Sequence, residues 1–592
     1  MTGHPDTNPL DRTAFRIALV AIAAGIGLRL WAAGARGSLW LDEASLALNI
    51  LGRSANALAT PLDWGQAAPV GFLWAEKAVT ALLDPTARAL RLVPCLAGVL
   101  TLLWTWQAGR RMVGPLAAVL ATVVVAFSLI ALRYSAEVKP YATDAATAIA
   151  LIGLAGWVGA GAGDVRRWAA LGFAGTIAVT CSLPSVFVLA ACGIALGADA
   201  WAHGPRVRRI AAAAAVAWVA MFGVLWIVAI GPASGGAYLR EYWAPVMLDP
   251  RAGDFVARVV RALASAVGTP VSWTGSVALA LACAALWLTG AVILARRAWR
   301  TGVLLVGPFV LAAIASMIGV YPLSDRLAFF IAPAALLVAA VPVAMSVAFV
   351  SGAVGRMLQG VGAPETVSAG RAPAAVVWAT ALALGAFVGG DAWRFVRAPG
   401  SLEPTQALFA SVRDDAVRDS TPVYVFARAV PAWVFATTEW RAPDDVRLAR
   451  YVALAGRTDA PAHENFARSR AVRPGEGDTL VVARGAVTEL VGLAPGVRYR
   501  IAGPTSAPAP SEGWADAEAR RIALAAATDG ARHKRTGSAW VVASHFFEGT
   551  PRDELAPLVG ALRAAGLTVA EERRTGRDAL ALRVEARPPA GG

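Results

Sequence analysis

Long apolar runs separated by short polar stretches dominate the chain up to residue 398. A hydrocarbon core about 30 Å thick is crossed by about 20 helical residues, so runs of this kind predict membrane-spanning helices. Eleven runs are expected to span, near residues 15–34, 89–108, 112–132, 141–161, 168–182, 184–200, 209–230, 273–295, 302–320, 327–350 and 373–393. The fifth and sixth flank Ser182, Leu183 and Pro184, and can also be read as one long broken helix, which would reverse the direction of every later span.

Clusters of arginine at the ends of the apolar runs decide between these two readings. Basic residues gather in the short cytoplasmic loops of membrane proteins. With eleven spans and a cytoplasmic N-terminus, four clusters fall on one side, at residues 110–111, 166–167, 206–209 and 296–300. An odd number of spans then places the C-terminal region on the opposite, extracytoplasmic side. We therefore expect a multi-pass protein of the inner (cytoplasmic) membrane.

Composition agrees with a membrane protein and excludes other classes. The 592 residues are 57% hydrophobic and 16% charged, too apolar for a soluble protein. The net charge of +14 would suggest nucleic acid as a partner of a soluble chain, but the arginines lie between apolar runs, which is typical of membrane topology. We expect membrane lipids and no nucleic acid among the partners. The cysteines all fall inside apolar segments without metal-ligand spacing and are interpreted as small buried residues: Cys95, Cys181, Cys192 and Cys283.

Beyond Pro399 the pattern becomes that of a soluble α/β domain. Strand-like runs are predicted at 422–426, 479–483 and 539–544, with a strand hairpin over 567–572 and 579–584 around Thr575-Gly576, and helices at 404–418, 514–528 and 552–565. The expected division is a transmembrane domain over 1–398, with interfacial helices in its first outer loop over 35–88, and an extracytoplasmic domain over 399–592.

The first outer loop carries two adjacent acids, Asp42 and Glu43, among apolar residues. If 40–51 is helical, Asp42, Ser45 and Asn49 share one face of a helix that lies along the membrane. The plain alternative is that both acids have no function beyond a favourable interaction with the positive end of the helix dipole in the first turn. Further on, Gln66 precedes an apolar helix that is too short and, because of Glu76-Lys77, too charged to span the membrane easily. Gln66 either faces a polar ligand or belongs to an ordinary helix start.

The second outer loop is short and rich in ionisable groups: Arg133, Glu137, Lys139, Tyr141 and, one turn into the next helix, Asp144. Ionisable groups are costly near hydrocarbon, so such a cluster is a functional candidate. The alternatives are a local ion pair, snorkelling of the basic side chains and a helix cap at Asp144.

A third outer loop, Tyr321-Pro322-Leu323-Ser324-Asp325-Arg326, places a guanidinium near the headgroup level. Arginine there can grip a phosphate with two hydrogen bonds, or serve as an interfacial anchor. The chain has no P-loop, no dinucleotide fingerprint and no His-rich metal motif. Nucleotide-driven transport is therefore not supported.

The order of these loops resembles the GT-C superfamily of polytopic glycosyltransferases, in particular bacterial relatives of the protein mannosyltransferases and lipid A aminoarabinose transferases. The matching pieces, in roughly residues 15 to 440, are Trp40-Leu41-Asp42-Glu43, Gln66-Ala67-Ala68-Pro69, the run from Arg133 to Tyr141, and Tyr321 to Arg326. The tail after the last helix is also similar, although its strand content does not identify a carbohydrate-binding module.

The resemblance implies transfer of a sugar from a polyprenyl-phosphate-linked donor to a cell-envelope acceptor, with inversion if the acceptor attacks directly. It makes Asp42 the base with Glu43 in support, and Lys139, Arg326 and Arg133 the cations for the donor phosphate. Substrate contacts are expected at Gln66, Tyr141 and Asp144, and a divalent cation, Mg²⁺ or Mn²⁺, at Asp42 and Glu137. Two other classes stay open: a transporter or lipid-linked sugar flippase, which would need ionisable groups at the bilayer midplane, and a non-catalytic scaffold.

Overall fold

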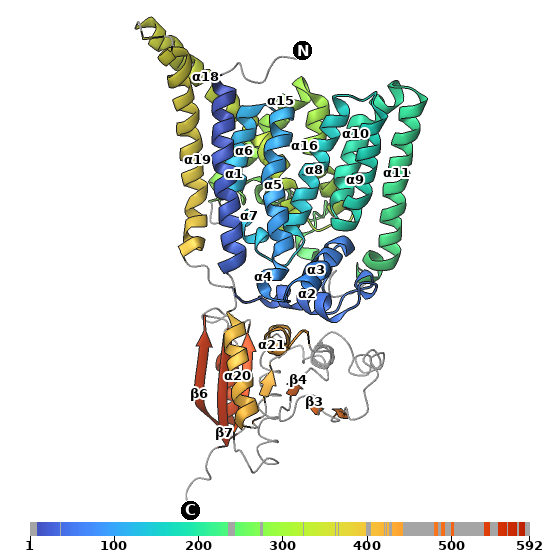
Figure 1. The fold of residues 1–592 in the computed structure, drawn as a ribbon, viewed down its shortest axis with the longest axis vertical. Helices are drawn as coiled ribbons and strands as arrows, with labels where there is room; N and C mark the ends of the chain where they lie inside the picture. Colours follow the sequence, from blue (N-terminus) through green and yellow to red (C-terminus); the bar gives the residue numbers. More distant parts are fainter. Residues whose placement is uncertain are drawn as a thin grey trace, which may run out of the picture.

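The computed structural model describes residues 9–35, 37–234, 243–272, 276–323, 325–361, 363–364, 366–397, 404–419, 421, 423–425, 429–441, 479–482, 487–491, 499–502, 538–544, 555–564, 566–576 and 579–586. A bundle of long helices occupies one end of the molecule and a β-sheet the other, with short helices between them (Figure 1). The predicted helix over 514–528 lies outside the described residues.

The described bundle holds nine helices that are long and apolar enough to cross a membrane, in agreement with a multi-pass membrane protein. Six of them are single helices: α1 (Pro9–Ala35), α8 (Tyr141–Gly159), α10 (Ser185–Ala202), α15 (Val277–Arg297), α16 (Trp299–Met317) and α19 (Ala372–Arg397). The other three join consecutive helical segments: α4 with α5 (Ala87–Leu90 and Leu92–Met112), α11 with η2 (Pro205–Leu225 and Trp226–Ile230), and α17 and η4 with α18 (Asp325–Ala328, Phe329–Ile331 and Ala332–Gly360). The bent pair α6 (Pro115–Phe127) and α7 (Leu129–Ser135) makes ten in the described part of the chain if it is counted as one span. The remaining predicted run is α9 (Val165–Cys181), which is shorter, with 17 residues, and lies beside α11 in the bundle (Figure 1).

The chain reverses direction at Ser182, Leu183 and Pro184, so the reading of this region as one broken helix is wrong. Helices α9 and α10 are separate and run side by side in the bundle (Figure 1). The predicted arginine clusters consequently share one end of the bundle: at the end of α5, at the starts of α9 and α11, and at the junction of α15 and α16. The sheet lies beyond the opposite end, which we call the sheet end (Figure 1).

One predicted span is broken near the sheet end. Helices α6 and α7 meet at an angle of 61°, and Ser128 at the break caps α7 by accepting a hydrogen bond from the Ala131 N–H. The buried guanidinium of Arg29 on α1 donates to the carbonyls of Val125 (2.8 Å) and Ala126 (3.4 Å), which the break leaves without helical partners. A charged donor inside the bundle thus stabilises the end of a helix that does not cross in one piece.

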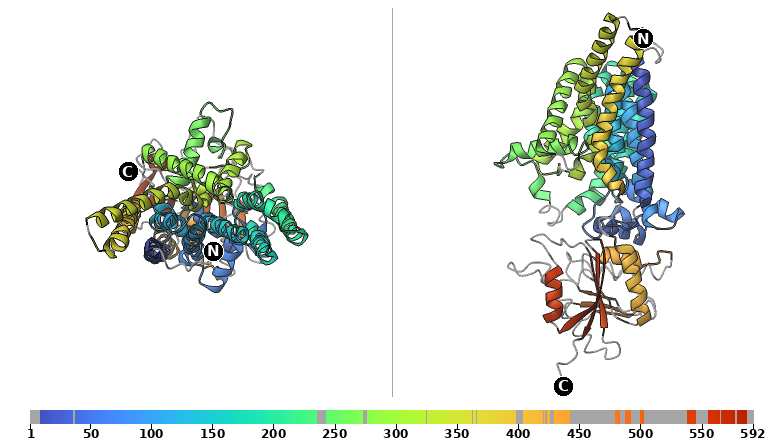
Figure 2. Two further views of the ribbon diagram at one scale, coloured as in Figure 1. Left: turned by 90° about the horizontal axis from the view of Figure 1, so that it is seen from above. Right: turned by 90° about the vertical axis from the view of Figure 1, so that its left-hand side faces the viewer.

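Short helices of the first loop lie at the sheet end of the bundle. They are α2 (Leu41–Gly52), η1 (Ala57–Ala59), α3 (Val70–Leu82) and the four-residue α4. Figure 2 shows them between the bundle and the sheet. The predicted helix over 40–51 is therefore confirmed.

The C-terminal region contains a mixed seven-stranded sheet in the order β2-β3-β4-β1-β5-β7-β6. Its elements are α20 (Thr405–Asp419), β1 (Val423–Val425), α21 (Val430–Thr437), β2 (Thr479–Val482), β3 (Val487–Val491), β4 (Tyr499–Ala502), β5 (Ser538–Ser544), α25 (Leu555–Ala564), β6 (Leu567–Thr575) and β7 (Ala579–Ala586). Strand β1 is parallel to β4 and β5, and the other pairs are antiparallel. Helices α20 and α25 cover opposite faces (Figure 2). The predicted hairpin around Thr575-Gly576 is confirmed; β3, β4 and α21 were not predicted.

One apolar cluster joins the first loop to the C-terminal region. It includes Leu39, Leu46, Ile50 and Phe72 from the loop, and Phe409, Trp433, Trp540 and Leu582 from the helices and strands beyond α19. Two polar contacts cross the same boundary: the Gln406 N–H donates to Ser38 Oγ at 3.1 Å, and Arg441 pairs with Asp84 at 2.7 Å. Burial of shared apolar surface therefore fixes the C-terminal region against the helix that carries Asp42 and Glu43.

Candidate active site at the sheet end

The first and third loops meet in an ion pair between Asp42 and Arg326. Arg326 Nη1 donates to Asp42 Oδ2 at 3.0 Å, although the two residues are 284 positions apart in the sequence. Each side chain is 25% exposed, so the pair is in contact with solvent on one side. Asp42 occupies the first turn of α2, and Arg326 is the second residue of α17, which leads through η4 into α18. The two residues that the sequence put forward as base and phosphate ligand therefore lie together.

Aromatic rings surround the Arg326 guanidinium. Its carbon lies 6.0 Å from the ring centre of Tyr141 and 5.6 Å from that of Trp243. Tyr141 in turn packs on Tyr134, with ring centres 5.0 Å apart. Cations over aromatic faces are attracted by the ring quadrupole, which fixes the head group of Arg326 in place. Tyr141 thus joins the group as predicted, whereas Trp243 was not among the predicted residues.

Lys139 of the second loop is 5% exposed and donates from Nζ to Gln66 Oε1. Burial lowers the pKa of Lys139 below its ordinary value, and the nearby Arg326 lowers it further. The carboxylates of Asp42, Glu137 and Glu43 act in the opposite direction. The structure therefore brings Lys139 and Gln66 to the same group as Asp42 and Arg326, although sequence spacing alone could not pair them.

Glu43 is held in a different way from its neighbour Asp42. Its carboxylate is 1% exposed and accepts hydrogen bonds from Arg91 Nε (3.1 Å), Arg91 Nη2 (2.8 Å), the Trp40 N–H (3.2 Å) and the Val138 N–H (2.8 Å). These donors come from the N-terminus of α2, the start of α5 and the second loop. Glu43 consequently fastens three segments, and its oxygens are already engaged by protein donors.

Arg91 was missed in the sequence because it sits at the edge of an apolar run, where it looks like one more interfacial arginine. The side chain is 1% exposed and also donates to the Ser38 carbonyl at 2.7 Å. Its bidentate geometry toward Glu43 is the strong form of a carboxylate–guanidinium pair. A single arginine within or beside an apolar run, like Arg29 and Arg91, is the signal that could have marked both residues.

Arg133 and Glu137 form an ion pair within the second loop, with Nε and Oε2 3.5 Å apart. Glu137 is 1% exposed, so the local ion pair considered from the sequence is present. Among the residues that the structure describes, no three His, Cys, Asp or Glu side chains come together as a group able to hold a metal ion. The two predicted metal ligands, Asp42 and Glu137, are each paired with an arginine instead.

Asp144 lies half-buried in the first turn of α8, and its Oδ1 has no hydrogen-bond partner among the described residues. Tyr321 of the third loop donates from its hydroxyl to the Leu327 carbonyl at 2.9 Å. Burial raises the pKa of Tyr321 well above its ordinary value. Among the described residues of the third loop, Arg326 makes the hydrogen bond to the first loop.

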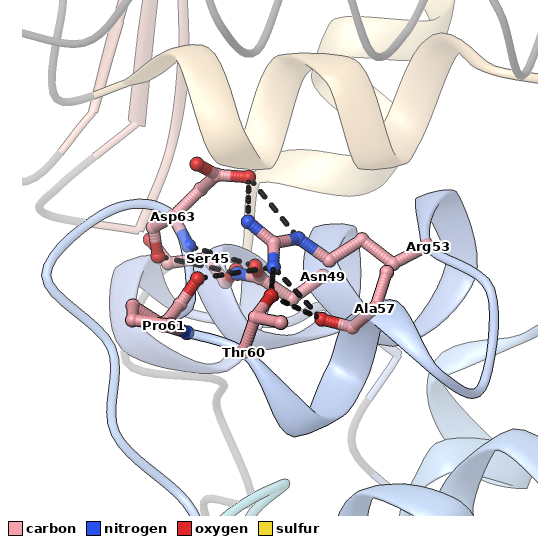
Figure 3. Close-up of polar contacts among 7 residues, drawn as sticks. All are labelled: Ser45, Asn49, Arg53, Ala57, Thr60, Pro61 and Asp63. Carbon is pink, nitrogen blue, oxygen red and sulfur yellow. Dashed lines mark hydrogen bonds and ion pairs between the residues drawn. The ribbon is translucent and has the colours of Figure 1, made fainter. Parts of the chain in front are cut away.

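A clamp in the first loop, made by Asn49 and Arg53, holds Asp63, three residues before Gln66 (Figure 3). Arg53 donates from Nε (3.3 Å) and Nη2 (2.6 Å) to Asp63 Oδ2, while Asn49 holds the backbone of Asp63 on both sides, accepting from its N–H at 2.9 Å and donating to its carbonyl at 3.2 Å. The next residue, Trp64, has φ +63°, a left-handed conformation that costs a non-glycine residue about 1–3 kcal/mol. Clamp and strained turn come directly before Gln66, and neither was predicted.

Glu76 on α3 is fully buried and neither of its oxygens has a hydrogen-bond partner among the described residues. Burial raises its pKa well above the ordinary value, and the charge of Glu43 acts in the same direction. The neighbouring Lys77 caps α2 by donating to the carbonyls of Ile50 and Leu51 at 2.9 and 3.2 Å. Of the pair Glu76-Lys77 that interrupts the apolar helix, Lys77 therefore caps α2, and Glu76 is a buried carboxyl group.

Comparison with known proteins gives solved structures but no sequence relatives. No family model and no curated protein matches the chain. ArnT from Cupriavidus metallidurans in the apo state is similar at 12% identity and a TM-score of 0.45, over 95% of this chain and 97% of ArnT. The same protein bound to undecaprenyl phosphate gives 13% and 0.42 over the same shares.

A second similar protein is the oligosaccharyltransferase AglB from Archaeoglobus fulgidus, solved with an inhibitory peptide and a dolichol-phosphate. Identity is 14% and the TM-score 0.44; the match covers 72% of this chain and spans only 63% of the AglB chain. ArnT and AglB are both GT-C glycosyltransferases, the superfamily that the loop motifs resemble. At these identities and scores the likeness assigns no activity to this chain.

Chemically, the site offers one carboxylate within reach of solvent and several cations around it. Asp42 can accept a proton, and Arg326, Lys139 and Arg133 can stabilise a developing negative charge. The partly buried setting strengthens these electrostatic interactions relative to open water. The arrangement fits a reaction in which a hydroxyl is deprotonated while an anionic group departs.

Proposed function

We propose that the chain is a membrane glycosyltransferase that transfers a sugar from a polyprenyl-phosphate-linked donor to a cell-envelope acceptor. The observation that carries this proposal is the 3.0 Å pair of Asp42 with Arg326 beside the buried Lys139. Three loops far apart in the sequence contribute one base and several cations at one end of a membrane bundle. A lipid-linked phosphate would reach the same level, because its chain lies in the bilayer.

In the proposed reaction Asp42 takes the proton from an acceptor hydroxyl. The oxygen of that hydroxyl attacks the anomeric carbon of the donor sugar, and the bond between that carbon and the phosphate oxygen breaks. A new glycosidic bond forms, polyprenyl phosphate leaves with the electron pair, and the proton ends on Asp42. One direct displacement inverts the anomeric configuration.

The leaving phosphate is neutralised by Lys139, Arg326 and Arg133 in this proposal. Arg326 donates to Asp42, and a phosphate oxygen would be a second acceptor for the same guanidinium. Transfer of Arg326 to the phosphate would break this ion pair with the Asp42 carboxylate. Donor binding would in this way prepare the base.

The remaining predicted residues take supporting roles. Glu43 positions rather than reacts, since protein donors occupy its oxygens. Gln66 orients the Lys139 ammonium, and Tyr141 holds the Arg326 head group. Asp144 stays a proposed substrate-binding residue because its Oδ1 is free to accept a hydrogen bond within the described surroundings.

A resident Mg²⁺ or Mn²⁺ does not fit Asp42 and Glu137 as they are arranged. Each carboxylate already pairs with a guanidinium, and a hard divalent cation normally takes about six oxygen ligands. A metal held by these two carboxylates would have to displace both guanidinium groups. No step of the proposed reaction runs through a metal.

For sidedness, we propose that the sheet end faces the periplasm or the exterior and that the arginine-rich end is cytoplasmic. This orientation follows the positive-inside rule and gives a transmembrane domain over 1–398 and an extracytoplasmic domain over 399–592. The site would then face acceptors outside the cytoplasm. The C-terminal domain would lie directly over the helix that carries Asp42, with which it shares an apolar cluster.

The test is Asp42→Asn in membranes supplied with radiolabelled polyprenyl-phosphate sugars and a cell-envelope acceptor extract. The matched control is Asp84→Asn, an acid of the same loop whose side chain is 74% exposed. We expect the Asp42 variant to lose transfer and the control to retain it. Retained transfer by Asp42→Asn sinks the assignment of the base. A wild-type protein that transfers none of the sugars, yet moves the lipid-linked sugar from one leaflet of a vesicle membrane to the other, supports the alternative of a flippase or transporter.

A further inference from the structure

The turn Asp63-Trp64-Gly65-Gln66 places a large aromatic residue where the backbone favours a small one. Trp64 and Gly65 have φ values of +63° and +60°, and the Gln66 N–H donates to the Asp63 carbonyl at 3.4 Å. Positive φ at both central positions is typical of turns built from Asn, Asp and Gly. Trp64 is the one non-glycine residue with positive φ in the described part of the chain.

This conformation is imposed from the two ends of the turn. On one side, Arg53 and Asn49 hold Asp63 through its carboxylate and its backbone (Figure 3). On the other, Gln66 accepts from Lys139 Nζ and donates from its own amide to the Trp64 carbonyl at 3.2 Å. The turn is therefore a rigid link between the α2 clamp and the cation of the candidate active site.

The Trp64 side chain is half-buried against the apolar cluster shared with the C-terminal region. Its indole N–H is buried and has no hydrogen-bond acceptor among the described residues. A tryptophan that only filled space would not need a left-handed backbone, and strain of this kind is concentrated at ligand-binding sites. The residue offers an aromatic face and an unused donor two positions from Gln66.

A sugar ring has the complementary chemistry. Its C–H groups carry partial positive charge and suit the negative face of an aromatic ring, and its hydroxyls accept hydrogen bonds from an indole N–H. We propose that Trp64 is a sugar-binding residue of the active site and contacts the ring of a substrate sugar. The inference rests on the proposed glycosyl transfer and adds to it a residue that determines substrate recognition.

The test compares Trp64→Gly, which suits the turn but lacks the ring, with Trp64→Phe, which keeps an aromatic face without the N–H. KM and kcat are measured separately for the lipid-linked donor and for the acceptor, because either could supply the sugar ring. Binding of sugar-free polyprenyl phosphate is measured alongside. The matched control is Trp440→Phe, a tryptophan on the same apolar cluster whose indole N–H already donates to the Phe435 carbonyl at 3.2 Å.

We expect Trp64→Gly to raise KM for one of the two substrates at least about tenfold, Trp64→Phe to raise it less, and sugar-free polyprenyl phosphate to bind as in the wild type. The substrate whose KM rises is the source of the sugar ring. An unchanged KM in folded Trp64→Phe and Trp64→Gly overturns the inference, as does a parallel loss of polyprenyl phosphate binding, which would indicate a purely structural role. If Trp64→Gly does not fold, the KM of Trp64→Phe against that of Trp440→Phe decides. A wild-type protein without transfer refutes the proposed function itself, whereas unchanged variants of an active enzyme refute only the role of Trp64.

Discussion

Replacing Glu43 by glutamine distinguishes a structural acid from the proposed base, Asp42, at the adjacent position. The variant removes the charge that faces Arg91, whose side chain is 1% exposed, and so leaves a guanidinium buried without its counter-ion. Breaking a buried pair from one side costs about 3–5 kcal/mol. By contrast, Asp42→Asn opens a pair whose members are each 25% exposed, for which the cost is about 0–1 kcal/mol.

The assay is thermal unfolding of the detergent-purified protein at one fixed heating rate, because large membrane proteins often unfold irreversibly. We expect Glu43→Gln to lower the unfolding midpoint clearly and Asp42→Asn to leave it near that of the wild type while transfer is lost. The double variant Glu43→Gln with Arg91→Met removes the uncompensated charge and should recover part of the midpoint. A Glu43→Gln midpoint equal to that of Asp42→Asn would refute the reasoning.

Three further predictions concern pH, metal and orientation. Burial lowers the pKa of Lys139, so its ammonium loses its proton at a lower pH than that of an ordinary lysine. Transfer should therefore fall as pH rises through that lowered pKa, and Lys139→Arg should move this decline to higher pH. Superimposable pH–rate profiles of the two proteins would contradict the role of Lys139 in neutralising the phosphate. Because the unfolded chain binds more protons between the lowered and the ordinary pKa, this lysine should make stability rise with pH in that window, which denaturation at several pH values can measure. Since Asp42 and Glu137 are paired with arginines, transfer should persist in excess chelator, and complete loss restored by Mn²⁺ would speak against that view. A reporter that works only in the periplasm should be active when fused after Pro399; an inactive fusion would reverse the proposed topology.

Much of the fold could be predicted because its signals are local. Each apolar run corresponds to one helix in the structure except 112–132, which forms the bent pair α6 and α7, and the hairpin around Thr575-Gly576 has its turn residues in the expected place. Length, hydropathy and turn chemistry suffice for such elements, since each depends on residues close together in the chain. The strands β3 and β4 escaped prediction because they are short and stable only through pairing with β2 and β1.

The candidate site could be predicted only as a set of loops. Lys139 was selected because ionisable residues are costly near hydrocarbon, and Asp42 and Arg326 because of their loop positions and the resemblance to the GT-C superfamily. Their partners were not predictable, because a contact such as Asp42 with Arg326 joins positions 284 apart. The resemblance put Asp42 ahead of Glu43, and the structure adds a physical difference between them: Glu43 is buried and accepts from four donors, whereas Asp42 is partly exposed.

By itself the sequence determined the solvent of each part: apolar runs specify a membrane bundle, and the polar tail specifies a domain in water. Only the tertiary structure decided that the helix breaks at Ser128 between α6 and α7, where Arg29 donates hydrogen bonds to the carbonyls at the end of α6. It also decided that Arg91 is the counter-ion of Glu43 and that Trp64 is held in a left-handed turn. The physical reason is range. Hydropathy acts residue by residue, whereas ion pairs, helix breaks and strained turns exist only when distant segments are packed closely enough to stabilise them.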